Sequence, residues 1–425
     1  MKEKNIARFN WSIVVSCFFT LALVYGVWYS FSIFFVSLLK EFGWSRSVGA
    51  GAFSLFIIVS SIISPFVGSM VSSAHPHRVL IGGSLLLGAG LTLCSFTRTW
   101  WHFYLSFSFI TASGLGAAGW VPNITLIQRW FKEKRGMAMG IVSAGIGIGI
   151  LICVPSIQYL IIQVGWRMAY RIMAVFIPLV VIFLATLFLR QPPPSPSHQI
   201  EVEIPLKTGR DPLVIDEEWA SRSWTVRKAM ATRPFWLLTL AFLLGSFIIQ
   251  SVFAHQVAFF MDCGLEPLPA SYIVGIVGVV SIGSKILWGI MADQRGREMI
   301  YTIGITCTLL GLLSLILYSQ MPVSSFPYFY ALFFGSGYAV QAALPPLIIA
   351  DFFEGQAYGE IFGTLMVFVG VGGAVGAWFA GFLYDQTGSY LPVFMIMIAC
   401  AVISCLNVWK ASPRKVRSVP GKLHP

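Results

Sequence analysis

The stretch SIGSKILWGIMADQRGR, residues 281–297, places a lysine inside an apolar run that ends in a short charged loop. The apolar block around it, residues 270–292, is long enough to cross a hydrocarbon layer of about 30 Å at about 1.5 Å per residue. Lys285 stands in the middle of this block. A full charge at the bilayer centre costs about 2.5–3.5 kcal/mol on insertion scales, so some other interaction must offset it.

Eleven further apolar blocks share this length, so twelve spanning helices are predicted. The chain is 57% hydrophobic and only 11% charged, whereas soluble domains carry about 25% charged residues. The ten-residue alternation typical of membrane β-barrels is absent. We therefore predict an all-α integral membrane protein without a cleavable signal peptide, with helices near 11–39, 48–72, 78–97, 102–127, 137–164, 168–189, 234–260, 270–292, 299–318, 326–350, 358–384 and 391–409.

Lysine and arginine in the loops predict the orientation. With a cytoplasmic N-terminus, 22 of the 28 Lys and Arg residues fall in inner segments and five in outer loops, and Lys285 is the remaining one. Both termini are thus expected on the cytoplasmic side of the cell inner (plasma) membrane. The net charge of +11 needs no nucleic-acid partner, because basic inner loops lie beside an anionic leaflet.

One long polar segment divides the chain into halves. Residues 190–233 open with a Pro/Ser-rich stretch typical of a linker. We predict an N-terminal six-helix bundle at 1–189, a cytoplasmic linker at 190–233, a C-terminal six-helix bundle at 234–410 and a cytoplasmic tail at 411–425. Four glycines recur 223 residues later, which indicates a repeat; the pairs are Gly136 and Gly359, Gly140 and Gly363, Gly149 and Gly372, and Gly165 and Gly388. Two parallel six-helix repeats are one of the known transporter architectures.

The loop GIMADQRGR resembles the signature G-x-x-x-D-x-x-G-R of the major facilitator superfamily. It supplies Gly289, Asp293, Gly296 and Arg297 as a conformational loop motif. The corresponding stretch of the first half, GSMVSSAHPHR at 68–78, lacks the acidic residue and the second glycine. The resemblance implies the major facilitator fold, in which a substrate lies near the midplane between the two halves.

A second motif resembles a narrower family. RWFKEKRGMAMGIVSAGIGIG at 129–149 is similar to the helix 4–5 signature of monocarboxylate transporters. The stretches at 232–236 and 352–390 resemble bacterial members of that group, which neighbours the oxalate/formate antiporters. The glycines at one-turn spacing also have a purely structural interpretation, since small residues let spanning helices pack closely.

Lys285 has two interpretations. Its stem could shorten the path to water at the inner end of the helix by snorkelling. Alternatively, its ammonium faces a water-filled cavity and binds an anion, since no acidic residue is predicted in the middle of a span. In the resembling transporters this position is typically an arginine that binds the substrate carboxylate, so lysine is a departure that keeps the charge but loses the planar fork.

Other candidates come from the same comparison. His255, near the outer end of its helix, is a gating or proton-coupling candidate, although a lone histidine there is often structural. Each pocket candidate is equally an ordinary packing or polar residue. These substrate-binding candidates are Trp120, Tyr338, Phe362, Asn123 and Tyr29, with Tyr25 and Gln341 as weaker ones.

The predicted function is secondary active transport of a small organic monocarboxylate, such as lactate or pyruvate, with H⁺ as co-substrate. The alternative on the same fold is efflux of larger amphipathic or aromatic compounds. A sensor or scaffold would be expected to carry a soluble partner domain, and an enzyme would need a nucleophile motif, a phosphate loop or a polar catalytic cluster. We expect no catalytic residues, no metal, no cofactor and a monomer; the seven cysteines form no metal-binding pattern.

Overall fold

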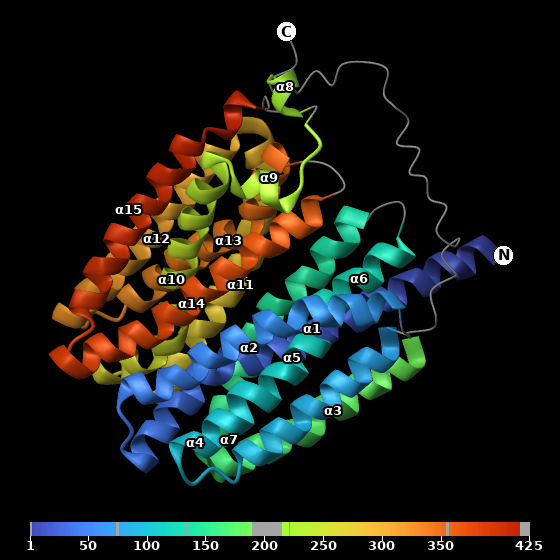
Figure 1. Cartoon of the computed structure of the whole chain (residues 1–425). Coiled ribbons are helices and arrows are strands. Elements are labelled where there is room, and N and C mark those ends of the chain that lie inside the picture. Colours follow the sequence, from blue (N-terminus) through green and yellow to red (C-terminus); the bar gives the residue numbers. More distant parts are fainter. Residues whose placement is uncertain are drawn as a thin grey trace. The chain divides into compact units, whose positions relative to one another are not determined.

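The computed structural model describes residues 2–73, 76–131, 135–188, 215–220, 222–353 and 357–416, and these ranges contain helices and short connections but no strand. Helices are expected in lipid because they satisfy every backbone polar group internally. The long ones are α1 (Lys2–Phe42), α2 (Arg46–Ser73), α3 (Pro76–Cys94), α7 (Arg135–Phe188), α10 (Arg233–Asp262), α11 (Pro267–Arg295), α12 (Arg297–Gln320), α13 (Phe326–Phe353), α14 (Tyr358–Thr387) and α15 (Leu391–Ala411) (Figure 1).

Ten helices of the described ranges are long and apolar enough to cross a membrane. One of them, α7, contains a candidate span of 52 residues, and its helix is interrupted at Gly165, where φ is 80°. It therefore supplies two crossings. A further crossing is built from shorter pieces, namely α4 (Trp100–Phe103), the π-helix η1 (Tyr104–Thr111), α5 (Ala112–Ala118) and α6 (Trp120–Trp130). The predicted all-helical membrane fold is confirmed for the described ranges.

By packing, the chain divides into two compact units. Unit 1 comprises Met1–Pro193, Gln250–Val279 and Ala374–Tyr390, and unit 2 comprises Pro194–Ile249, Val280–Gly373 and Leu391–Pro425. Most of the predicted linker, residues 190–214, lies outside the described ranges, and the tail is described only to residue 416. The predicted boundaries of the two six-helix halves remain a prediction.

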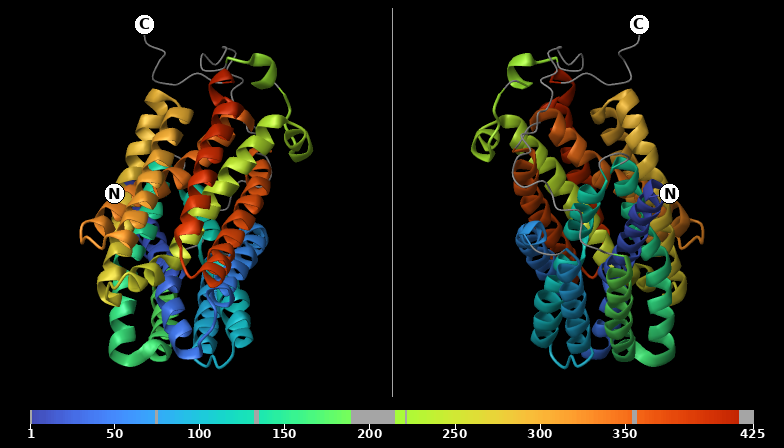
Figure 2. Two further views of the ribbon diagram at one scale, coloured as in Figure 1. Left: turned by 90° about the vertical axis from the view of Figure 1, so that its left-hand side faces the viewer. Right: turned by 90° about the vertical axis from the view of Figure 1, so that its right-hand side faces the viewer.

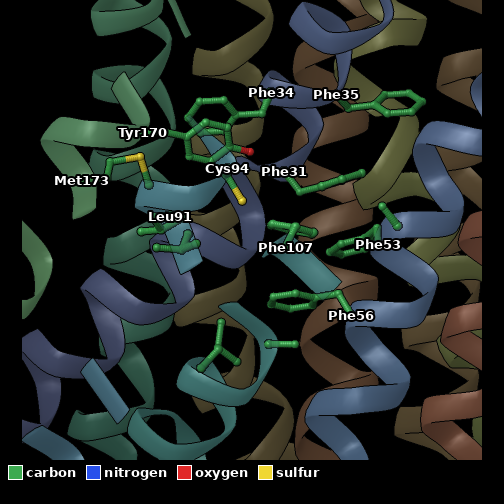
Figure 3. Close-up of a cluster of buried hydrophobic side chains, with 14 of the residues drawn as sticks. Phe31, Phe34, Phe35, Phe53, Phe56, Leu91, Cys94, Phe107, Tyr170 and Met173 are labelled. Atoms are coloured by element: carbon green, nitrogen blue, oxygen red, sulfur yellow. The ribbon is translucent and has the colours of Figure 1, made fainter. Parts of the chain in front are cut away.

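The core of unit 1 is rich in aromatic rings (Figure 3). Phe34 of α1 stacks on Tyr170 of α7, with ring centroids 3.8 Å apart. Phe31 of α1 stacks on Phe53 of α2 at 4.5 Å. Such pairs add about 0.5–1.5 kcal/mol each beyond area burial, so α1 is held against both α2 and α7 by large rigid groups.

In unit 2, α12 and α13 lie side by side (Figures 1 and 2). The end of the predicted linker adds two short helices, α8 (Glu217–Ala220) and α9 (Val226–Met230). Trp219 donates its indole N–H to the carbonyl of Phe352 at 2.7 Å, and Trp224 packs edge-on against Phe353 at 5.0 Å. This part of the chain is thereby fastened to the end of α13.

Two glycines of the predicted repeat make equivalent contacts within their own units. A Cβ on Gly149 of α7 would collide with the carbonyl oxygen of Ala22 on α1, and a Cβ on Gly372 of α14 would collide with that of Leu243 on α10. Gly165 and Gly388 also share positive φ values of 80° and 68°. Matching contacts and matching backbone conformations at one sequence offset support the predicted repeat.

Gly149→Ala is expected to destabilise unit 1 by about 1–3 kcal/mol, because the added methyl group must push α1 away from α7. Thermal unfolding of the purified protein in detergent measures this loss. Gly140→Ala is the matched control, since the same helix leaves open space around Gly140 and the substitution should be neutral or slightly stabilising. Equal melting temperatures for the two variants would contradict the close-approach interpretation.

Candidate functional site

Lys285 lies on α11 and is half-buried. Its ammonium nitrogen sits 5.1 Å from the centroid of the Tyr338 ring on α13, a cation–π contact within unit 2. No carboxylate of the described residues forms an ion pair with it. A desolvated cation–π contact contributes about 2 kcal/mol, which offsets part of the cost of the charge and leaves the ammonium donors available for an anion.

Two hydrogen bonds fix α11 against α13 next to this lysine. The hydroxyls of Ser284 and Ser336 lie 3.1 Å apart, and the indole N–H of Trp288 donates to the Ser336 carbonyl at 2.9 Å. Ser284 and Trp288 are both buried. These bonds hold α11 and α13 together in the same stretch of the two helices where Lys285 meets Tyr338.

The aromatic candidates are distributed over both units. Phe362 of α14 stacks on Tyr358 of the same helix, with ring centroids 5.9 Å apart. In unit 1, Tyr29 of α1 packs edge-on against Phe253 of α10 at 4.7 Å, and Trp120 is 39% exposed at the start of α6. A shared pocket of these residues with Lys285 remains a prediction.

Asn123 has a structural task at a helix break. The chain interrupts its helix at Gly119, between α5 and α6. The Asn123 side-chain amide donates to the carbonyls of Ala118 and Gly119, at 2.9 and 2.6 Å, and the residue is fully buried. The break and Pro122, which has no N–H, leave the Ala118 carbonyl without a helical donor, and the Asn123 amide supplies one. A substrate-binding role for Asn123 remains a prediction without support from these contacts.

His255 of α10 is almost fully buried, and both of its ring nitrogens are engaged in unit 1. Its Nε2 lies 2.9 Å from the Ala377 carbonyl, which can only accept, so Nε2 donates. Its Nδ1 lies 2.9 Å from the Tyr390 hydroxyl and in the neutral ring accepts from it. The predicted gating or proton-coupling role of His255 remains a proposal.

A cluster that sequence reasoning missed surrounds Arg46, the first residue of α2. Its guanidinium pairs with Asp262 at 2.7 Å, hydrogen-bonds the Tyr390 hydroxyl and stacks over the Tyr384 ring at 3.7 Å. Asp385 accepts from the backbone N–H groups of Arg46 and Ser47, both at 2.8 Å. The sequence contains only weak signs of this cluster. The predicted outer loops have few basic residues, and two aspartates lie at helix ends on the same side.

The loop motif has its own geometry within unit 2. Gly296 has a φ of 99° and precedes α12, which explains why glycine stands there. Arg297 pairs with Asp293 at 2.6 Å and with Asp351, at the end of α13, at 3.3 Å. Gly289 has open space around it. The motif therefore connects the end of α11, the start of α12 and the end of α13, while its role in conformational change remains a proposal.

The sequence places this helical protein in a class. It matches the profile of the Major Facilitator Superfamily over residues 17–341 and 270–424, so the chain belongs to that superfamily and is a secondary transporter of the membrane rather than an enzyme.

Named relatives agree with this class. The chain is 28% identical to monocarboxylate transporter 13 of Rattus norvegicus over 91% of its own length and 85% of the relative. It is 26% identical to monocarboxylate transporter 12 of Xenopus laevis, over 93% and 87%. Its fold is similar to a solved bacterial homologue of the human lysosomal transporter Spinster, in an inward-facing and unoccupied conformation. The TM-score is 0.70 at 14% identity, covering 96% and 98% of the two chains.

Asn123→Ala is expected to lower the stability by about 1–3 kcal/mol, because carbonyls at the break lose a buried donor. The measurements are the melting temperature in detergent and the transport rate of reconstituted protein. The matched control is Asn407→Ala, since that buried amide donates to Ile403 within a continuous helix and its loss should cost less. Unchanged stability with lost transport would instead favour a substrate contact at Asn123.

Proposed function

We propose that the protein transports small organic monocarboxylates, resembling lactate or pyruvate, by alternating access, and that Lys285 binds the carboxylate. The observation that carries the proposal is the half-buried Lys285 ammonium at membrane depth, resting on Tyr338 without a carboxylate partner among the described residues. A spanning segment retains such a charge mainly for function. Similarity to monocarboxylate transporters 12 and 13 over most of the chain supports the same substrate class.

The number of charges argues for a monoanion. Lys285 is the one basic residue that the sequence places in the middle of a span, and it balances one carboxylate. A lysine binds as a point charge on a flexible stem and gives up the bidentate geometry that arginine offers. The aromatic ring of Tyr338 beside the ammonium suits the small organic part of the substrate better than a second charged group.

The charge also suggests coupling to protons. Lys285 gives up its proton while the site is empty and takes one up again together with the carboxylate. In this proposal one H⁺ and one anion cross together, with the protein in the inner membrane of the cell and both termini in the cytoplasm. The basic residues of the inner loops support that orientation.

Lys285→Gln is expected to reduce the specificity constant for monocarboxylate uptake by about 10- to 100-fold, since a charged hydrogen bond contributes about 1.5–3 kcal/mol. Lys285→Arg should retain part of the activity. The assay is uptake of labelled monocarboxylates, dicarboxylates and larger aromatic compounds by proteoliposomes. Lys40→Gln, at an exposed site at the end of α1, is the control with the same charge change.

Normal monocarboxylate uptake by Lys285→Gln would overturn the proposal. Uptake or efflux confined to the larger aromatic compounds would favour the alternative function on the same fold.

Uptake into proteoliposomes is expected to accelerate as the external pH falls from 8 to 5, because the anion then enters with a proton supplied from outside. A pH gradient alone should also drive accumulation. A rate that stays constant across this range, with the substrate kept ionised, would exclude proton coupling while leaving anion binding by Lys285 intact.

A further inference from the structure

The Arg46 cluster, here called the outer closure, consists of Arg46, Asp262, Tyr384, Asp385 and Tyr390. All five residues lie in unit 1. Arg46 begins α2, whereas the other four come from the ends of α10 and α14 and from the residue before α15. In the predicted division of the chain, Arg46 therefore belongs to the first half and its four partners to the second.

We propose that Arg46 keeps the outer side of this transporter closed, and that Tyr390 couples Arg46 to His255. In this superfamily the substrate site lies between the halves and alternately opens to each side. Contacts that join the first half to the second at the outer ends must therefore form and break in every cycle. The outer closure is such a set of contacts.

The side chain of Arg46 contacts three of the other four residues of the cluster. Asp262 accepts a charged hydrogen bond at 2.7 Å, the Tyr390 hydroxyl accepts another, and the ring of Tyr384 covers the guanidinium face at 3.7 Å. The Arg46 side chain is only 14% exposed, while that of Asp262 is 36% exposed. Water can thus reach the ion pair from the Asp262 side, which keeps the bond reversible.

The backbone of α2 is fastened at the same place. Asp385 caps the first N–H groups of α2 at 2.8 Å, a position where the helix dipole also favours a carboxylate. A Cβ on Gly381 would collide with the Arg46 carbonyl, so α2 and α14 approach as closely as glycine permits. Further along α2, the Ser54 hydroxyl donates to the Ala374 carbonyl at 2.6 Å.

Tyr390 and His255 connect the outer closure to the interior of unit 1. The Tyr390 hydroxyl accepts from Arg46 and donates to Nδ1 of His255. His255 in turn donates to Ala377 on α14 and meets the edge of Phe35 of α1 at 5.2 Å. Tyr390 is thus a positioning residue for His255, and release of Arg46 removes one of the contacts that orient the phenol.

Cysteine accessibility tests the proposal without knowledge of the substrate. Ala258 lies on the same face of α10 as His255 and Asp262, one turn below the ion pair, and is 3% exposed. The reporter is Ala258→Cys in a chain whose native cysteines are replaced by alanine. Labelling with a membrane-impermeant maleimide from outside should be slow. Arg46→Gln should accelerate it about tenfold, the change that 1.4 kcal/mol of lost closure energy produces. Asp262→Asn should act in the same direction, and Arg46→Lys should give an intermediate rate.

The matched control is Arg167→Gln. Arg167 is also an arginine at the outer ends, and it pairs with Glu41, but this bond joins α7 to α1 within the first predicted half. Its loss should leave the labelling rate of Ala258→Cys unchanged. Equal rates for Arg46→Gln and Arg167→Gln would overturn the proposal.

A second reporter separates opening from unfolding. Cys94 is fully buried in the core of unit 1, so a chain that retains only this cysteine should stay unlabelled in the Arg46→Gln background. If Cys94 reacts as well, Arg46→Gln has unfolded the protein, and Arg46→Lys, which keeps the charge, becomes the test variant. Faster labelling of Ala258→Cys with Cys94 protected supports the closure, and an unchanged rate for Arg46→Lys then contradicts it.

Discussion

The absence of water in the hydrocarbon layer is the constraint on which the rest of the structure depends. Every backbone polar group that a helix break exposes there must find a partner within the protein. The chain meets this requirement at Gly119, where the Asn123 amide covers two carbonyls. Helices whose backbone groups are all paired can also approach each other closely where a glycine has no side chain, as α1 and α7 do at Gly149.

The same medium makes each charge in a span informative. Among the described residues, Lys285 meets the ring of Tyr338 and no counter-charge, and two hydrogen bonds through Ser336 hold α11 and α13 together beside it. An ammonium that rests on an aromatic ring and pairs with no carboxylate of the described residues keeps hydrogen-bond donors for an anion, as the proposed carboxylate site requires.

Sequence patterns predicted the all-helical membrane fold, because the length and hydropathy of a segment are local properties. They did not predict the contacts of Asn123, although Gly119 and Pro122 are local signs of a helix break, because the partners of a buried amide depend on how the two helix ends are arranged. They also counted Arg46 as an outer-loop charge and placed Asp262 and Asp385 at outer helix ends, without pairing the three. The bonds between these residues join positions more than 200 apart in sequence, and such pairings depend on how helices pack, which no local pattern records.

Lys285 and the Arg46 cluster differ in their chemistry. Lys285 lacks an acidic partner among the described residues and is suited to bind a ligand, whereas Arg46 is saturated by an aspartate, a phenol and an aromatic face and is suited to hold helices together. An arginine with several partners can exchange one of them for water at little cost, but losing all of them at once is costly. Such a contact stays closed against small fluctuations and opens only when α2 moves away from α10 and α14 as a whole, which is the behaviour that alternating access requires.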